Sequence, residues 1–140
     1  MDNDNMPSEK IRYAVMIPRF AAFVIDLTII YANLNMVINL FDIQISSEIE
    51  ELLLLLINMV YIITMTASSY QGTLGKILFG IITVDVNMQR LSFSHSLGRY
   101  FAYYFSYLTL GIGFLMIGLT KKYTGLHDKI AHTYVIYKNR

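Results

Sequence analysis

Arg19-Phe-Ala-Ala-Phe-Val-Ile-Asp26 opens an apolar run that continues to Phe41. The run has about the 20 residues that a helix needs to span a bilayer. Arg19 and Asp26 are nearly two helical turns apart, so they share one face of the predicted helix. Asn33 continues that face. Because an ionised carboxylate costs at least a few kcal/mol inside a bilayer, this face must contact protein or an aqueous cavity rather than lipid.

The composition also indicates a membrane protein. Of the 140 residues, 55% are hydrophobic and 15% are charged, and the mean hydropathy is +0.47. Soluble domains carry about 25% charged residues. The length allows one compact domain of a few spans. A net charge of +1 gives no electrostatic case for nucleic acid as a partner, and the absence of cysteine excludes disulfides, thiolate metal sites and thiol nucleophiles.

Three apolar stretches predict an all-α membrane protein. Helices are expected at about 19–41, 51–69 and 94–120, and Gly111 and Gly113 interrupt the last one near its middle. We therefore predict two full transmembrane helices and a bent or re-entrant third helical element. Residues 81–93 alternate in a way that predicts a short surface β-hairpin, with strands at 81–86 and 91–93 and a polar turn at 87–90.

The distribution of charge predicts how the chain is organised across the membrane. We interpret residues 1–18 as a polar cytoplasmic segment, residues 19–137 as the membrane domain and residues 138–140 as a tail. Lys10, Arg12 and Arg19 place the N-terminus in the cytoplasm, because positive charge in short loops stays inside. The loop at 42–51 has four acids and no lysine or arginine, and is expected outside. A re-entrant third element would return the basic C-terminus to the cytoplasm.

Four motifs, in order along the chain, resemble the RDD family of small membrane proteins, which is named for one arginine and two aspartates. They are Arg19 to Asp26; Gly72-Thr-Leu-Gly75-Lys76 with Gly80 and Val84-Asp85; Leu91-Ser-Phe with Leu97-Gly-Arg99; and Gly125-Leu-His127-Asp128-Lys-Ile-Ala131-His-Thr133. The resemblance covers roughly residues 12–137. One departure is His132, where the family usually has glycine, which puts a tight backbone approach there in doubt.

The resemblance implies an integral membrane protein, usually bacterial, for which transport or ion exchange is the usual suggestion. We therefore expect this chain in a bacterial plasma (inner) membrane, surrounded by lipid and with its N-terminus in the cytoplasm. Three spans are few for a solitary pathway. A homo-oligomer or a membrane-protein partner is accordingly expected.

The three name-giving residues, Arg19, Asp26 and Asp128, are predicted to meet near the cytoplasmic boundary. Arg99 is the most plausible extra partner for an acid there. Such a charged cluster could bind a cation, a proton or an anionic solute. It could equally be an internal ion pair that holds the C-terminal segment against the first helix, since removing one partner of a buried pair costs about 3–5 kcal/mol. The two roles are compatible.

Three further residues are supporting candidates: Asn33, Asn58 and His127. The asparagines could line a polar pathway, but interhelical hydrogen bonds, worth about 0.6–2 kcal/mol each, explain them more simply. His127 and His132 are five residues apart and do not share a helical face, so no metal site and no cofactor are predicted. No nucleophile is placed within reach of His127 and Asp128, so we do not expect an enzyme.

Two other groups of residues receive structural interpretations. Gly72 and Gly75 are too close together for a phosphate loop, and Ile77 rather than Ser or Thr follows Lys76. These glycines are expected to allow a turn and close packing, with Lys76 at the lipid headgroup level. Tyrosines recur at helical spacing in the third stretch and are interpreted as packing or interfacial side chains: Tyr100, Tyr103, Tyr104 and Tyr107.

The sequence leaves two functions open. The first is an oligomeric transport module for a proton, a cation or a small solute, with its site at Asp26. The second is a non-transporting membrane scaffold that assembles partner proteins. They differ in one physical property, because a transporter needs an accessible carboxylate at Asp26 and a scaffold can keep it dry and paired.

Overall fold

The computed structural model describes residues 11–109 and 112–138. Most of the predicted N-terminal segment, most of the tail and the predicted break at Gly111 lie outside these residues. The elements in chain order are α1 (Met16–Leu40), α2 (Ser47–Ala67), α3 (Leu74–Leu78), β1 (Ile81–Asp85), α4 (Phe93–Leu108), α5 (Ile112–Leu119), α6 (Leu126–Ile130) and β2 (Thr133–Tyr137). The predicted fold class, mostly helical with a small antiparallel sheet, is confirmed.

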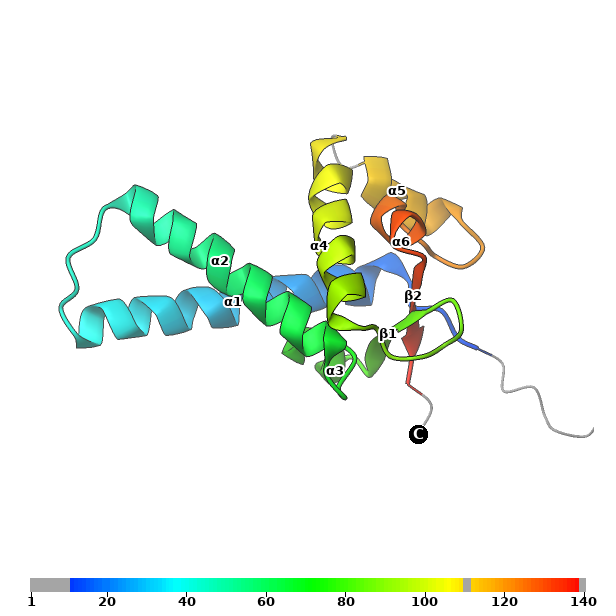
Figure 1. The fold of residues 1–140 in the computed structure, drawn as a ribbon, viewed down its shortest axis with the longest axis horizontal. Helices are drawn as coiled ribbons and strands as arrows, with labels where there is room; N and C mark the ends of the chain where they lie inside the picture. Colours follow the sequence, from blue (N-terminus) through cyan, green and yellow to red (C-terminus); the bar gives the residue numbers. More distant parts are fainter. Residues whose placement is uncertain (1–10, 110–111, 139–140) are drawn as a thin grey trace, which may run out of the picture.

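Helices α1 and α2 form the elongated part of the molecule (Figure 1). They have 25 and 21 residues and are long and apolar enough to cross a membrane, as predicted. Ser46 caps α2 by accepting a hydrogen bond from the Ile49 N–H, and Glu48 and Glu50 in the first turn favour this helix start. The loop between the two helices, with the acidic residues, lies at the far end from every other element.

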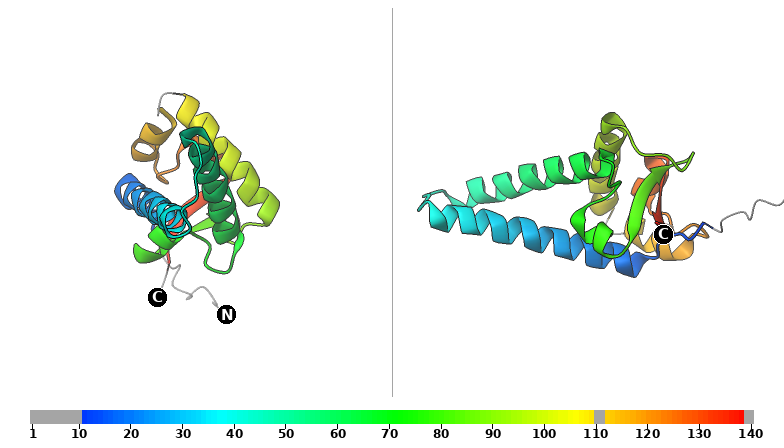
Figure 2. Two further views of the ribbon diagram at one scale, coloured as in Figure 1. Left: turned by 90° about the vertical axis from the view of Figure 1, so that its left-hand side faces the viewer. Right: turned by 90° about the horizontal axis from the view of Figure 1, so that it is seen from below.

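The third helical element is bent, as predicted. It consists of α4 and the shorter α5, with the break between Leu108 and Ile112. Ser92 begins α4 by accepting a hydrogen bond from the His95 N–H. In Figures 1 and 2, α4 crosses the direction of α1 and α2 steeply instead of running beside them. Entry of this element into the bilayer stays a prediction.

The second strand of the sheet is not the one that the sequence predicts. Strand β1 pairs antiparallel with β2, from Ile81 opposite Tyr137 to Asp85 opposite Thr133. The predicted strand at 91–93 is wrong, because Ser92 caps α4 and Phe93 is its first residue. The predicted turn does form: the Asp85 carboxylate accepts hydrogen bonds from the backbone N–H groups of residues 87 and 89.

Two backbone positions, Gly75 and His132, have geometries that suit glycine. A Cβ atom on Gly75 would lie 2.1 Å from the backbone oxygen of Ala22, so α3 packs directly on α1 only because residue 75 has no side chain. The predicted close packing is confirmed there. His132 has φ of 51°, the left-handed conformation that glycine adopts most easily. His132 therefore adopts a backbone conformation that suits the glycine usual in the family, although a histidine tolerates it less well.

Substitution of Gly75 by alanine tests the contact between α3 and α1. The added methyl group collides with backbone that cannot rotate away, so we expect a loss of about 1–3 kcal/mol or more of unfolding free energy. Chemical unfolding in detergent would measure it. The matched control is Gly98→Ala in α4, where a Cβ meets nothing within 4 Å. Equal stability of the two variants would contradict the packing described here.

Candidate functional site

The carboxylate of Asp128 holds together four elements of the structure. Arg19 of α1 donates from Nη1 to Oδ2 at 2.6 Å, and Arg99 of α4 donates from Nη1 to Oδ1. The backbone N–H of Gly125 also donates to Oδ2, at 3.1 Å, which caps α6. Arg99 further donates to the hydroxyl of Thr133, the first residue of β2. Asp128 has no exposed side-chain surface, so this is a buried ion pair.

The protonation states around Asp128 follow from burial and charge. Burial alone would raise the pKa of Asp128, but the charges of Arg99 and Arg19 together with the Gly125 N–H hold that pKa well below its usual range. Burial also lowers the pKa of His127 to about 3, so its imidazole is neutral at physiological pH. His127 Nε2 lies 3.5 Å from Asp128 Oδ1 and is a neutral neighbour of the ion pair.

Asp26 has a different set of partners. Its Oδ1 accepts a hydrogen bond from the Tyr61 hydroxyl of α2 at 2.8 Å and another from the Gly75 N–H of α3, also at 2.8 Å. Tyr61 in turn accepts one from the Leu74 N–H at 2.8 Å. Within the described part of the chain Asp26 forms no ion pair with Arg19. The three name-giving residues thus divide into two groups, one around Asp128 and one around Asp26.

Lys76 belongs to the site, although the sequence interpretation placed it at the lipid headgroups. Its Nζ donates to the hydroxyl of Thr83 on β1 at 2.9 Å, because the contact between Gly75 and Ala22 turns this face of α3 toward the interior. Burial, together with the nearby charges of Arg99 and Arg19, lowers the pKa of Lys76 to about 7. Spacing along the sequence gave no signal for this inward direction.

These charged groups line one cavity of about 610 Å³, which is partly open to the outside. Arg19 and Asp26 line it from α1, Lys76 from α3, Arg99 from α4 and His127 from α6. Further lining comes from polar and apolar side chains that include Thr73, Ser96, Tyr100, Tyr103, Phe20, Phe23 and Ile62. Tyr100 and Tyr103 therefore face the cavity as well as packing. Its lining residues come mainly from α4 and from the parts of α1 and α2 next to the sheet. Figure 1 shows how α4 lies across this end of the two long helices.

The two asparagines that the sequence proposed as supporting residues do not line this cavity. Asn33 is exposed and donates to the Ile29 carbonyl one turn earlier in the same helix, at 2.7 Å. Asn58 is half-buried, and its amide nitrogen has no hydrogen-bond partner among the described residues. Neither asparagine therefore contributes to this cavity. In the described ranges, no group of three His, Asp or Glu side chains is placed to hold a metal ion.

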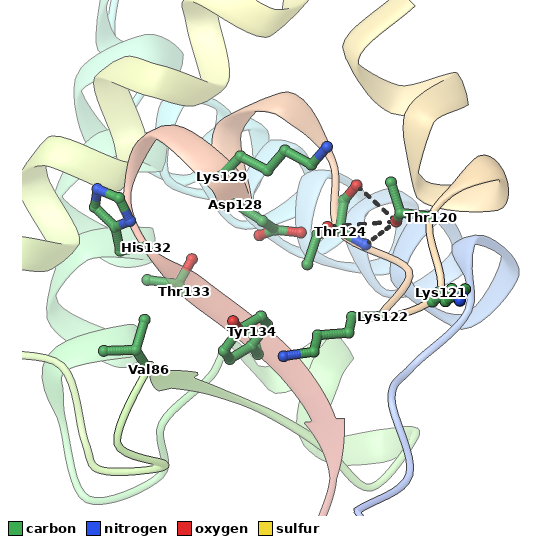
Figure 3. A pocket seen from close by; sticks show the side chains of 10 residues that line it. All are labelled: Val86, Thr120, Lys121, Lys122, Thr124, Asp128, Lys129, His132, Thr133 and Tyr134. Atoms are coloured by element: carbon green, nitrogen blue, oxygen red, sulfur yellow. Dashed lines mark hydrogen bonds between the residues drawn. The ribbon is translucent and has the colours of Figure 1, made fainter.

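A second pocket, of about 310 Å³, opens on the surface behind Asp128. Figure 3 shows its lining, with Lys121, Lys122 and Lys129 around Asp128. Lys122 lies over the ring of Tyr134, with its Nζ 4.9 Å from the ring centroid. Asp128 lines this surface pocket, whereas its partners Arg19 and Arg99 line the larger cavity. The salt bridges between these three residues therefore separate the surface pocket from the larger cavity.

Substitution of Asp128 by asparagine would leave Arg19 and Arg99 buried without a counter-charge. We expect a loss of about 3–5 kcal/mol in unfolding free energy, measured by denaturant unfolding in detergent. Asp42→Asn, at an exposed position in the loop after α1, is the matched control and should stay near the parent protein. A loss below about 1 kcal/mol would place the pair in the range of exposed salt bridges and contradict its burial.

The lowered pKa of Lys76 predicts a pH-dependent stability. Between about pH 7 and its ordinary pKa of 10.5, the folded protein has released the Lys76 proton and the unfolded chain still holds it. Stability therefore rises with pH across this window. Thermal unfolding in detergent should show the rise in the parent and in the exposed control Lys129→Met, and a smaller rise in Lys76→Met. Parallel profiles for the parent and Lys76→Met would refute the inward placement of this lysine.

Comparison with known proteins adds the family context. The model of the RDD family matches residues 13–132. An uncharacterized protein, YxaI, of Bacillus subtilis (strain 168) is 44% identical over 87 residues, which are 62% of this chain and 57% of the relative. The chain thus spans little more than half the length of that relative. No solved structure matches.

Proposed function

This chain belongs to the RDD family and carries two apolar helices long enough to span a bilayer, so it is a membrane protein, and we propose that it acts as a small transport module. The transported species is a small solute that occupies the cavity lined by Asp26 and Arg19. The observation that carries the proposal is the cavity itself, because buried charges that served stability alone would be enclosed by packed side chains.

The size of the cavity favours a solute over a proton or a bare cation. Its volume of about 610 Å³ lies within the range of roughly 300–1,000 Å³ typical of small-molecule sites. A metal ion needs a few coordinating oxygens and a proton needs one titratable group, and neither needs such a volume. Among the three substrates that the sequence left open, the small solute is thus best supported.

Asp26 is both paired by hydrogen bonds, as expected for a scaffold, and in contact with the cavity, as expected for a transporter. It is only 4% exposed and accepts hydrogen bonds from Tyr61 and Gly75, which suits a structural role. It also lines the cavity, which suits contact with a solute. We propose that Asp26 fixes the shape of the site through α2 and α3 while its charge contributes to solute binding.

Orientation and assembly complete the proposal. Lys76, Arg99 and the lysines of the surface pocket lie at one end of α1 and α2, and the acidic loop lies at the other (Figure 1). Because positive charge in short loops tends to stay inside, the cavity end and the N-terminus lie on the cytoplasmic side of a bacterial plasma membrane. Two long spans cannot enclose a complete pathway, so a second copy or a membrane-protein partner supplies the remaining wall.

Flux assays in proteoliposomes test transport directly. Three small solutes of different charge (choline, erythritol and succinate) would be followed by light scattering, and an internal pH dye would report proton exchange driven by sodium or potassium. We expect flux above that of empty liposomes, reduced at least about tenfold in Asp26→Asn, the factor for roughly 1.4 kcal/mol of lost interaction.

The substitution is chosen to remove charge and keep structure. The amide oxygen of asparagine can still accept hydrogen bonds from Tyr61 and Gly75. Asn33→Ala, at an exposed position nearly two turns further along the same helix and away from the cavity, is the matched control. No flux for any solute or ion, from folded protein, would refute the transport proposal. The alternative, a non-transporting scaffold for partner proteins, would then be pursued by pull-down from the membrane.

A further inference from the structure

We infer that the partly open cavity lined by Arg19 and Asp26 binds a small organic anion. Its carboxylate or phosphate group lies against Arg19, Lys76 and Arg99, and its apolar part packs against the aromatic side chains of Phe20 and Phe23. The inference rests on the proposed function, because it names the chemical class of the solute for the same cavity.

The balance of charge around the cavity favours an anion. Three basic side chains line it, Arg19, Lys76 and Arg99, against one acid, Asp26. Asp128 neutralises part of this charge from the other side of the wall, and His127 is neutral. With both carboxylates counted and Lys76 charged, one positive charge remains in excess. A bound monoanion would compensate it, whereas a cation would add a second uncompensated charge in a poorly solvated site.

Unpartnered polar atoms at the cavity provide a second, independent observation. Arg19 Nε, Thr73 Oγ1 and Ser96 Oγ are buried and have no hydrogen-bond partner among the described residues. All three side chains line the cavity, and Thr73 and Ser96 are 3% and 2% exposed. Buried polar groups in proteins are almost always hydrogen-bonded. Each of the three suits an acceptor such as a carboxylate or phosphate oxygen, because Nε–H is a donor only and a hydroxyl can donate.

The remaining Arg19 geometry also suits an oxyanion. Its Nη1 is bonded to Asp128, and its Nη2 makes a long contact of 3.5 Å with the Val135 carbonyl. The Nε edge of the guanidinium is left for another acceptor, and arginine binds carboxylate and phosphate groups strongly through such planar contacts. A carboxylate or phosphate is therefore the anionic group that best suits the Nε edge of Arg19.

The rest of the lining indicates that the anion is amphipathic. Phe20, Phe23, Ile62 and Ile117 add apolar surface to the cavity. A purely polar anion would leave these apolar side chains in contact with water. Two sources share the required chemistry: a free organic acid or phosphate ester, and an anionic lipid whose headgroup enters from the bilayer. The lysines of the surface pocket, which lie behind Asp128, raise the local concentration of either kind of anion at this end of the protein.

The test is direct binding in nanodiscs of phosphatidylcholine, a lipid without net charge. Calorimetry at about pH 6, roughly one unit below the Lys76 pKa so that its amine is mostly protonated, would compare hexanoate with its cationic counterpart hexylammonium. Empty nanodiscs would correct for partitioning. We expect saturable binding of hexanoate and none of hexylammonium. Lys76→Gln keeps a donor for Thr83 and should weaken hexanoate binding roughly tenfold or more. Lys138→Gln, an exposed lysine that does not line the cavity, should bind like the parent.

Repetition in nanodiscs that contain phosphatidylglycerol separates the two sources of the anion. If the lipid is the occupant, hexanoate binding disappears there and native mass spectrometry retains phosphatidylglycerol on the protein. If the occupant is a free organic anion, hexanoate binding is unchanged. The inference is overturned if hexylammonium binds in preference, or if neither hexanoate nor phosphatidylglycerol binds to the folded protein.

Failure of this inference and failure of the proposed function give different results. Hexanoate or lipid binding without flux in proteoliposomes would keep the anion site and remove transport. Flux of choline, erythritol or protons that depends on Asp26, without anion binding, would keep transport and remove the anion site.

Discussion

The buried carboxylate of Asp128, held between Arg19 and Arg99, is the interaction on which the rest of the structure depends. A carboxylate without exposed surface is tolerated only when several donors compensate for its lost hydration. Here two guanidinium groups and one backbone N–H do so. Because the donors come from α1 and α4, one short C-terminal helix fixes the relative positions of elements that are far apart in the sequence.

A second polar contact determines the space that these elements leave. Asp26 joins α1 to α2 through Tyr61 and to α3 through Gly75, whose missing side chain allows the backbones to touch. Asp26 lines the cavity itself, and Asp128 holds Arg19 and Arg99, which also line it. Its walls carry more positive than negative side chains, since Lys76 is turned inward by the same contact. The constraint that packs the helices also sets the charge of the site.

The sequence predicted most of the fold and part of the site. Apolar length alone located α1 and α2, and the glycines at 111 and 113 predicted the interruption that separates α4 from α5. Arg19, Asp128 and Arg99 were correctly expected to form a charged contact. The partner of β1, the inward direction of Lys76 and the separation of Asp26 from Arg19 were not predicted. Each of these depends on contacts with distant segments.

The sequence by itself determined which segments are helical, which of them suit a membrane, and which charged residues must be compensated. These properties depend on hydropathy and on spacing within a few helical turns. Only the tertiary structure decided the partners, because Arg19 bonds to a carboxylate 109 residues away and β1 pairs with the last strand of the chain. Because Arg19 and Asp26 lie on the same face of one helix, Asp26 was a reasonable partner to expect for Arg19. Packing of α6 against α4 brought Asp128 within reach of Arg19, and Tyr61 and Gly75 donate to the Asp26 oxygen instead.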